Sequence, residues 1–388
     1  MIVVIADDLT GAAEIGGIGL RYQMKVEIEM KLNLDSDADL LIIATDIRSQ
    51  TVASAKSQIK LIAQRIKKLE KQPEFIFIKI DSVLRGHILT ELQVLLEELD
   101  KRVALLVPAN PHLGRTIKEG IYFINGNKLH ESEFKDDPQF SSHTSSVKDL
   151  VEGETSAIIS IPPSDEIPSE GMVLGEASSE KDMELWSKKV QNYVIPSGAS
   201  GFFSAILREK GLGLSTNLID SISGMGEKRL FVCGSAFPSS KNLVRSAIAK
   251  KKAVSLIPSA LTKTTAVASS VAFQSWIDEI LSLLKDKNSV ILATHPDSMF
   301  PRKEQPDILK MNMAIAVQYL LKESELQELL IEGGATAFTI LNRLGVSRAY
   351  PVQELSNGVI RMALPHNKNL HITLKPGSYD WPDLLKPV

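Results

Sequence analysis

The chain has 388 residues, of which 44% are apolar and 23% are charged, and its formal net charge is −3. At about 100–200 residues per domain, this length predicts two or three domains, each able to bury a core. The composition is close to the globular average, which argues against a collagen-like, coiled-coil or disordered chain. The near-neutral charge gives no reason to expect a nucleic-acid partner, because dedicated nucleic-acid binders usually carry a basic excess.

Cysteine usage and hydropathy narrow the class further. Cys233 is the only cysteine, which excludes an intramolecular disulfide and any cysteine-rich zinc site. No apolar run approaches the ~20 residues that cross a membrane, so we expect no membrane partner. The N-terminus reaches Asp7 and Asp8 after six residues, which does not fit a secretory signal. We therefore expect a cytoplasmic protein. Its oligomeric state is left open, a homo-oligomer included.

Residues 1–110 contain short apolar runs, each followed by a stretch with helical spacing. The runs are typical of buried strands and cover residues 2–6, 40–45, 75–80 and 103–107. Amphipathic helices are predicted over residues 52–69 and 88–99, where apolar residues recur every three or four positions. Apolar strands alternating with such helices indicate a parallel sheet covered on both faces.

The pattern is weaker from about residue 111 to 225 and then resumes. Strands are predicted at 157–161 and 193–196, a helix at 183–192, and a loop at 162–169. The Ser- and Gly-rich stretch 220–228 is taken as a linker, which gives domains of residues 1–225 and 226–388. Beyond it, strands are predicted at 229–234, 289–294, 329–332 and 370–374, and helices at 241–250, 267–284, 311–321 and 335–344. The predicted fold class is α/β. It comprises two α/β domains in series, each with a mostly parallel sheet flanked by helices, and an active site in the cleft between them.

Polar and charged side chains follow each of the four N-terminal strands. They are Asp7 and Asp8, then Arg48, then Lys79, Asp81, Ser82 and Arg85, and then Asn110 and Arg115. Ligands of open α/β sheets bind at the carboxyl ends of the strands, so we expect these side chains to converge on one rim. Helix N-caps explain a single Asp, Ser or Asn. They do not explain the cations, which are unfavourable near helix N-termini and therefore suggest an anionic ligand.

The carboxylates beside these cations are suited to take a proton from a hydroxyl group or to help hold a divalent ion. The whole set suggests a small polyol that bears a negative group. We predict catalytic roles for Asp8, Asp81 and Arg85, with Asp8 or Asp81 as the general base. Substrate-binding roles are predicted for Asp7, Arg48, Lys79, Ser82, Asn110 and Arg115. Metal ligands are not assigned.

The strand ends of the C-terminal half carry small residues instead. These are Cys233, Gly234 and Ser235, then Glu332 followed by Gly333, Gly334, Ala335 and Thr336, and then Lys375, Pro376, Gly377 and Ser378. A glycine turn that opens a helix presents backbone N–H groups to a phosphate. Glycine also makes ordinary tight turns, but three such loops in one domain favour a nucleotide site.

Several familiar motifs are absent from the sequence. There is no P-loop pattern, no G-x-G-x-x-G after a strand, no H-x-x-x-H zinc pattern and no G-x-S-x-G elbow. A P-loop protein is therefore excluded, and a dehydrogenase becomes a distant alternative.

Seven stretches, in order, resemble the four-carbon acid sugar kinase family. They are ADDLTGA (6–12), KIDSVLRGH (79–87), PANPHLGRT (108–116), a DP followed by Ser (137–146), CGSAFPSS (233–240), EGGATA (332–337) and KPGSY (375–379). The resemblance implies an N-terminal acid-sugar-binding domain and a C-terminal nucleotide-binding domain. It implies transfer of the ATP γ-phosphoryl group, with Mg²⁺, to a terminal hydroxyl of threonate, erythronate or 3-oxo-tetronate. Carried over by motif, the ATP contacts are Ser235, Gly333, Gly334, Ala335, Thr336 and Gly377.

Three positions depart from the family pattern. Val83 stands where the family commonly has Thr, Ala335 where it has an acidic or polar residue, and Tyr379-Asp380 where it often has Phe-Gly. The departures bear on substrate identity and on nucleotide contacts. Two alternatives remain at this point: a kinase for a different small hydroxy acid, and a non-catalytic sensor that binds a sugar acid.

Overall fold

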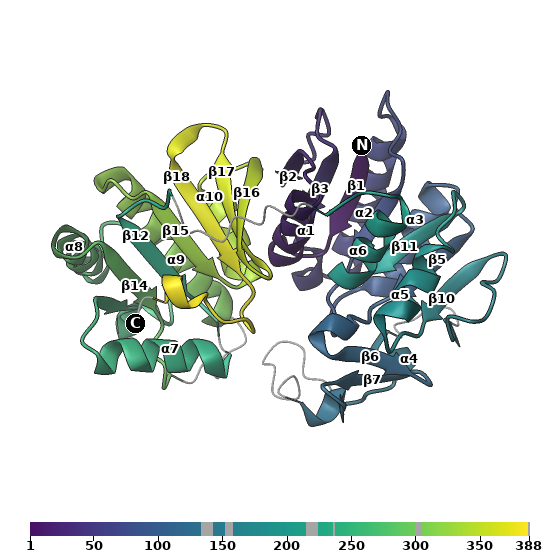
Figure 1. Cartoon of the computed structure of the whole chain (residues 1–388). Helices are drawn as coiled ribbons and strands as arrows, with labels where there is room; N and C mark the ends of the chain where they lie inside the picture. Colours follow the sequence, from purple (N-terminus) through teal and green to yellow (C-terminus); the bar gives the residue numbers. More distant parts are fainter. Residues whose placement is uncertain (133–142, 152–157, 215–223, 236, 299–304, 387–388) are drawn as a thin grey trace. The chain divides into compact units, whose positions relative to one another are not determined.

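The computed structural model describes residues 1–132, 143–151, 158–214, 224–235, 237–298 and 305–386. The chain forms two compact units, Met1–Thr216 and Asn217–Val388. Each is an α/β unit built on its own sheet (Figure 1), which confirms the predicted fold class. The predicted boundary after residue 225 stays a prediction, because residues 215–223 lie outside the described part. The same holds for the predicted interdomain cleft.

The sheet of the first unit is parallel throughout its described strands. These are β1 (Ile2–Ala6), β2 (Val26–Glu29), β3 (Leu40–Ala44), β4 (Ile76–Lys79), β5 (Val103–Val107), β9 (Ile159–Ile161), β10 (Gly171–Gly175) and β11 (Val194–Gly198). Their order across the sheet is β2-β3-β1-β4-β11-β5-β10-β9. Every residue of β1, β3 and β5 is buried, as expected for strands covered on both faces.

Helices cover this sheet in two layers. They are α1 (Leu9–Arg21), α2 (Val52–Lys67), α3 (Ile88–Glu98), α5 (Glu180–Ser187) and α6 (Ser200–Glu209). The short helix α4 (Val147–Val151) lies apart from them, near β7 (Ile121–Ile124) (Figure 1). Helix α6 packs against both α1 and α5, while α2 packs against α3. Short 3-10 turns lie at Ile47–Ser49, Pro111–Leu113 and Leu129–Glu131.

Glycine lets α1 approach the sheet closely. A Cβ built on Gly19 would lie 2.6 Å from Val26 Cγ2 and 2.7 Å from Leu40 Cδ2. Real Cβ atoms do not approach other atoms so closely, so a side chain at this position would push α1 off the strands. The small residue therefore lets the last turns of α1 lie against the amino ends of β2 and β3.

One expectation fails after β5. The sequence pattern predicts a helical stretch after each of the four predicted N-terminal strands. After the last of them, β5, the chain instead forms a small antiparallel sheet. Its strands are β6 (Arg115–Lys118), β7 (Ile121–Ile124) and β8 (Asn127–Lys128). The reason lies in the turns, because Gly114, Gly120 and Gly126 all adopt the positive φ that tight reversals require.

The second unit has a mixed sheet. Its strands are β12 (Arg229–Cys233), β13 (Val254–Leu256), β14 (Ser289–Ala293), β15 (Glu328–Glu332), β16 (Arg348–Ser356), β17 (Val359–Leu364) and β18 (Asn367–Lys375). Their order is β13-β14-β12-β15-β18-β17-β16. The first five are parallel, whereas β17 pairs antiparallel with both β18 and β16.

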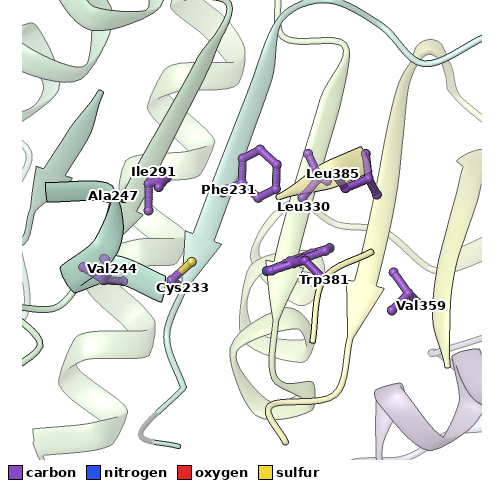
Figure 2. Close-up of a cluster of buried hydrophobic side chains, with 10 residues drawn as sticks. Phe231, Cys233, Val244, Ala247, Ile291, Leu330, Val359, Trp381 and Leu385 are labelled. Carbon is purple, nitrogen blue, oxygen red and sulfur yellow. The ribbon is translucent and has the colours of Figure 1, made fainter. Parts of the chain in front are cut away.

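The helices of the second unit are α7 (Pro238–Ala249), α8 (Val271–Asp286), α9 (Gln305–Glu323) and α10 (Gly334–Arg343). Helix α9 packs against α8 and α10. A core on the α7 side of the sheet joins Phe231, Val244 and Leu330 to Trp381 from the last segment of the chain (Figure 2). A 3-10 turn at Asp383–Leu385 follows Trp381, and another lies at Ser259–Leu261. In the described residues we find no helix with the length and apolarity to cross a membrane.

The two units share one strand-order pattern. In the first unit the chain makes β1, moves outward to β2, returns to β3 beside β1, and then crosses to β4 on the other side of β1. In the second unit β12, β13, β14 and β15 repeat that order. Such a reversal leaves a crevice at the carboxyl ends of the two central strands, where ligands of open α/β sheets bind. The fold therefore provides one candidate ligand site in each unit.

Gly198 shows how tightly the chain is packed at the carboxyl ends of the strands in the first unit. It ends β11 beside Lys79, and a Cβ at this position would lie 2.1 Å from the backbone oxygen of Val107. Because a backbone oxygen in a sheet cannot move aside, Gly198→Ala is expected to destabilise the fold by about 1–3 kcal/mol. Thermal unfolding measures this loss. The control is Gly213→Ala, at an exposed site with no atom within 4 Å of the added Cβ. Equal melting temperatures for the two variants would contradict the close packing.

Candidate functional site

The first site begins where β1 passes into α1. Asp8 is the N-cap of α1, and its carboxylate accepts hydrogen bonds from Gly11 N at 2.6 Å and from Thr10 Oγ1 at 2.8 Å. A Cβ on Gly11 would lie 2.8 Å from Asp8 Oδ1 and 3.2 Å from Lys79 Nζ. Only glycine at this position leaves room for a carboxylate and an ammonium group above the first turn of the helix.

Arg48 binds the carboxylates of two neighbouring strand ends. Its Nε and Nη2 donate to Asp7 Oδ2 at 2.9 and 2.8 Å, and its Nη1 lies 3.1 Å from Asp8 Oδ2. The same Nη1 is 3.6 Å from Asp81 Oδ1. One guanidinium group therefore gathers three aspartates that come from the ends of β1 and β4.

Asp81 is held by a second guanidinium group. Arg85 Nε and Nη2 each donate to one oxygen of the Asp81 carboxylate at 2.8 Å, a bidentate pair. The backbone N–H groups of Val83 and Arg85 also donate to Oδ2, at 3.3 and 3.2 Å. Each oxygen of Asp81 thus accepts at least one hydrogen bond from the protein.

Lys79 and Asn110 are joined by two residues that the sequence did not single out. Lys79 Nζ lies 3.3 Å from Glu14 Oε2, and Ser200 Oγ donates to Glu14 Oε1 at 2.8 Å. Asn110 Nδ2 then donates to Ser200 Oγ at 3.2 Å. The sequence carried two signals for these residues. Glu14 is a charged residue one and a half turns into α1, and Ser200 is a hydroxyl-bearing residue at the start of α6.

The small antiparallel sheet reaches the same region through Ser82. Arg115 at the start of β6 donates to Ser82 Oγ, and Tyr122 of β7 donates to the Ser82 carbonyl oxygen. Asn110 and Arg115 form an isolated bridge at the base of this sheet. All nine predicted catalytic and substrate-binding residues of the N-terminal half therefore lie at the carboxyl ends of β1, β3, β4 and β5.

The aspartates differ in proton affinity. Burial, reinforced by Asp8, raises the pKa of Asp7 to about 6 even though Arg48 opposes the shift. For Asp8, burial is outweighed by Arg48 and Lys79, and its pKa is lowered. The pKa of Asp81 is also lowered, because Arg85 and Arg48 outweigh its burial. Asp7 Oδ1 is buried and has no hydrogen-bond partner among the described residues. Asp7 is therefore the aspartate closest to changing charge near neutral pH.

Glu91, on α3, is a further buried carboxyl group in this region. Its residue is 3% exposed, and burial together with the charge of Asp7 raises its pKa to about 8. The sequence pattern had assigned no role to it, because a lone Glu in an amphipathic helix is ordinarily solvated.

The second site lies at the ends of β12, β15 and β18. A Cβ on Gly377 would lie 2.6 Å from Ser235 Oγ, and one on Gly234 would lie 2.7 Å from Thr336 Oγ1. Gly333, with φ +90°, is the N-cap of α10, whose first residue is Gly334. The structure thus brings together the three predicted glycine loops, and it sets the N-terminus of α10 among them, with Ala335 and Thr336 in its first turn.

Two buried charged residues support these loops. Lys375 and Glu332 end the neighbouring strands β18 and β15, and their side chains, each 1% exposed, form an ion pair of 2.7 Å. Both had been noted only as residues preceding the glycine turns. In the sequence, each of them directly follows buried apolar residues and directly precedes a glycine-containing turn.

Metal binding was left unassigned by the sequence. In the described ranges no group of three or more His, Cys, Asp or Glu side chains is arranged to hold an ion. The aspartates of the first site are instead paired with arginines. The residues DP followed by Ser at 137–146 lie mostly outside the described part.

Family models match both units. A sugar-binding N-terminal domain matches residues 2–205, and a nucleotide-binding C-terminal domain matches residues 230–379. Among characterised proteins, the chain is 23% identical to a D-threonate kinase of Salmonella typhimurium, over 90% of this chain and 88% of that protein. It is also 23% identical to a 3-oxo-tetronate kinase of Cupriavidus necator, over 98% of this chain and 94% of that protein.

Solved structures show the same fold. A Salmonella typhimurium LT2 protein described as a proposed tRNA synthase superposes with a TM-score of 0.74 at 18% identity, covering 98% of this chain and 96% of that one. A Haemophilus influenzae protein superposes with a TM-score of 0.69 at 18% identity, covering 99% and 98%. The sugar-binding model alone matches more than half of the sequence, and the nucleotide-binding model follows it in the expected order. The chain therefore belongs to the four-carbon acid sugar kinase family, a family of enzymes.

Proposed function

We propose that this protein transfers the γ-phosphoryl group of ATP to a terminal hydroxyl group of a four-carbon sugar acid of the threonate, erythronate or 3-oxo-tetronate type. The observation that carries the proposal is the contrast between the two crevices. The first is rich in paired aspartates and arginines, whereas the second is lined by glycine turns and a helix N-terminus. Relatives named D-threonate, 3-oxo-tetronate and D-erythronate kinase support the substrate class.

The first crevice suits a polyhydroxylated anion. Asp8 and Asp81 offer acceptors for substrate hydroxyl groups, and Arg85 and Arg115 offer donors suited to a carboxylate. Arg48, Lys79 and Arg85 are already paired with protein carboxylates. A substrate carboxylate therefore has to compete for guanidinium donors, which favours an acid whose hydroxyl groups bind the aspartates at the same time.

The second crevice suits the phosphates of a nucleotide. The N–H groups at the start of α10 have no partners within the helix, and the helix dipole favours negative charge there. Gly333 and Gly334 leave this end without side-chain bulk, so phosphate oxygens can approach the backbone. Ser235 and Gly377, from the loops after β12 and β18, lie close together, because a Cβ on Gly377 would be 2.6 Å from Ser235 Oγ.

Transfer requires the acceptor hydroxyl oxygen to bond to the γ-phosphorus while the bond from that phosphorus to the β-phosphate oxygen breaks, releasing ADP. The hydroxyl proton passes to one of the aspartates on Arg48, namely Asp7, Asp8 or Asp81. Arg48 and Arg85 stabilise the negative charge that develops on the transferred group. Mg²⁺, if bound together with ATP, would neutralise part of the charge of the phosphates. The described residues form no ready cluster for it, so we assign it no protein ligand.

The proposal is tested by incubating the purified chain with ATP, Mg²⁺ and a panel of four-carbon acids. The panel contains both stereoisomers of threonate, erythronate and 3-oxo-tetronate, with glycerate as a three-carbon control. We expect ADP release with at least one four-carbon acid and a phosphate ester in the ³¹P spectrum of the product. Melting-temperature shifts with these acids but no ADP release would instead favour a sugar-acid sensor.

The pH dependence of turnover follows from Asp7. Because its pKa is raised to about 6, it gains a proton as the pH falls through that value and loses its charge pairing with Arg48. We therefore expect kcat to decline below about pH 6. Stability changes in the opposite direction, because Asp7 holds its proton longer in the folded than in the unfolded chain. The free energy of unfolding therefore falls as the pH rises from about 4 to about 6. A kcat–pH profile measures the decline. A plateau that continues below pH 4 would contradict it and point to Asp8 or Asp81, whose pKa values are lowered.

A further inference from the structure

Strand β15 carries a buried ion pair at each end. At its carboxyl end, Glu332 pairs with Lys375, and at its amino end, Glu328 pairs with Arg361 of β17 at 2.6 Å. Both glutamates are 1% exposed or less. A buried ion pair is weak evidence for stability, since the loss of hydration offsets most of the attraction. The role of each ion pair is therefore inferred from the other groups that its side chains contact.

The amino-end pair has structural partners only. Gly226 N donates to Glu328 Oε1 at 2.9 Å, and Arg361 Nη2 donates to the Gly224 carbonyl oxygen at 3.0 Å. These contacts attach the first residues of the second unit to the amino end of β15, at the end of the sheet opposite the glycine loops. This pair lies a full strand length away from the second crevice.

The carboxyl-end pair contacts the loops of the second crevice directly. An ammonium group has three donors, and Lys375 Nζ directs all of them to Glu332 Oε1, the Pro376 carbonyl oxygen at 2.9 Å and the Tyr379 carbonyl oxygen. The loop that contains Gly377 is therefore wrapped around this ammonium group. Trp381 covers it, with its ring centroid 5.5 Å from Nζ (Figure 2 shows Trp381 beside the strands).

Glu332 extends the connection to the other two loops. Its Oε2 accepts a hydrogen bond from Ser240 Oγ at 2.6 Å, and Ser240 lies in the first turn of α7, just after the Ser235 loop. Gly333, the next residue, donates its N–H to the Lys375 carbonyl oxygen at 2.9 Å. Cys233, the last residue of β12, lies in register with Glu332. One buried pair thus connects the ends of β12, β15 and β18.

We propose that Glu332 and Lys375 are positioning residues for the nucleotide. They act through the loops, because they fix Gly377 against Ser235 and set the entry into the Gly333 turn. This inference rests on the proposed function of the second crevice. It predicts that disrupting the pair weakens nucleotide binding selectively, whereas disrupting the Glu328–Arg361 pair leaves nucleotide binding intact.

The experiment compares Glu332→Gln and Lys375→Met with the matched controls Glu328→Gln and Arg361→Met in the full chain. Calorimetry measures the Kd for ATP and for the sugar acid, and thermal unfolding measures stability. We expect both pairs of variants to lower the Tm. We expect the Kd for ATP to rise at least tenfold only in the carboxyl-end variants, with the Kd for the acid changing less than threefold. Gly377→Ala, whose Cβ would meet Ser235 Oγ, serves as a positive control for a disturbed loop.

A milder variant covers the case in which the charge variants do not fold. Ser240→Ala removes one donor to Glu332 and is expected to raise the Kd for ATP several-fold at nearly unchanged Tm. Equal effects of the amino-end and carboxyl-end variants on ATP binding, or an unchanged Kd for ATP in Ser240→Ala together with Glu332→Gln, would overturn the positioning role alone. A parent protein that binds no ATP would overturn the proposed function, and the positioning role with it.

Discussion

Charge buried at the ends of parallel strands is the constraint around which both units are organised. Parallel strands direct their carboxyl ends, and the N-termini of the helices that follow, toward one edge of the sheet. In the first unit this edge holds Asp7, Asp8 and Asp81 around Arg48, and in the second it holds Glu332 and Lys375. Each charge is taken out of water, so each needs a partner with good geometry. Those partners are what fix the loops.

The two units use the same strand order with different side chains. In the first unit charged side chains themselves gather at the ends of the strands, which suits recognition of a small, polar, charged molecule. In the second unit the buried charges pair with each other and hold the glycine loops at the strand ends, which suits a larger anion recognised by N–H groups. Gly11 and Gly377 show how this difference is built. The first makes room for Asp8 and Lys79, and the second makes room for Ser235.

Much of this arrangement follows from the sequence. The apolar runs at 2–6 and 103–107 coincide with β1 and β5, because strands buried on both faces leave an unambiguous signal. The strand-end rule also places Asp7, Lys79 and Asn110 correctly at one edge. The antiparallel β6–β8 sheet was not predicted, since its strands are only two to four residues long and half-exposed. Glu14 and Ser200 were not predicted either, because their contacts join residues 186 positions apart. The partners of Lys375 are likewise set by tertiary structure.

The account assigns the sugar acid to the first unit and the nucleotide to the second. A crystal structure of the full chain with ADP and the acid that gives the highest turnover tests this assignment most directly. We predict acid oxygens within hydrogen-bond distance of Arg85 or Arg115 and of an aspartate on Arg48, and diphosphate oxygens against the N–H groups that open α10. A diphosphate bound among the aspartates and arginines of the first unit, with the glycine loops of the second unit contacting no ligand, would contradict it.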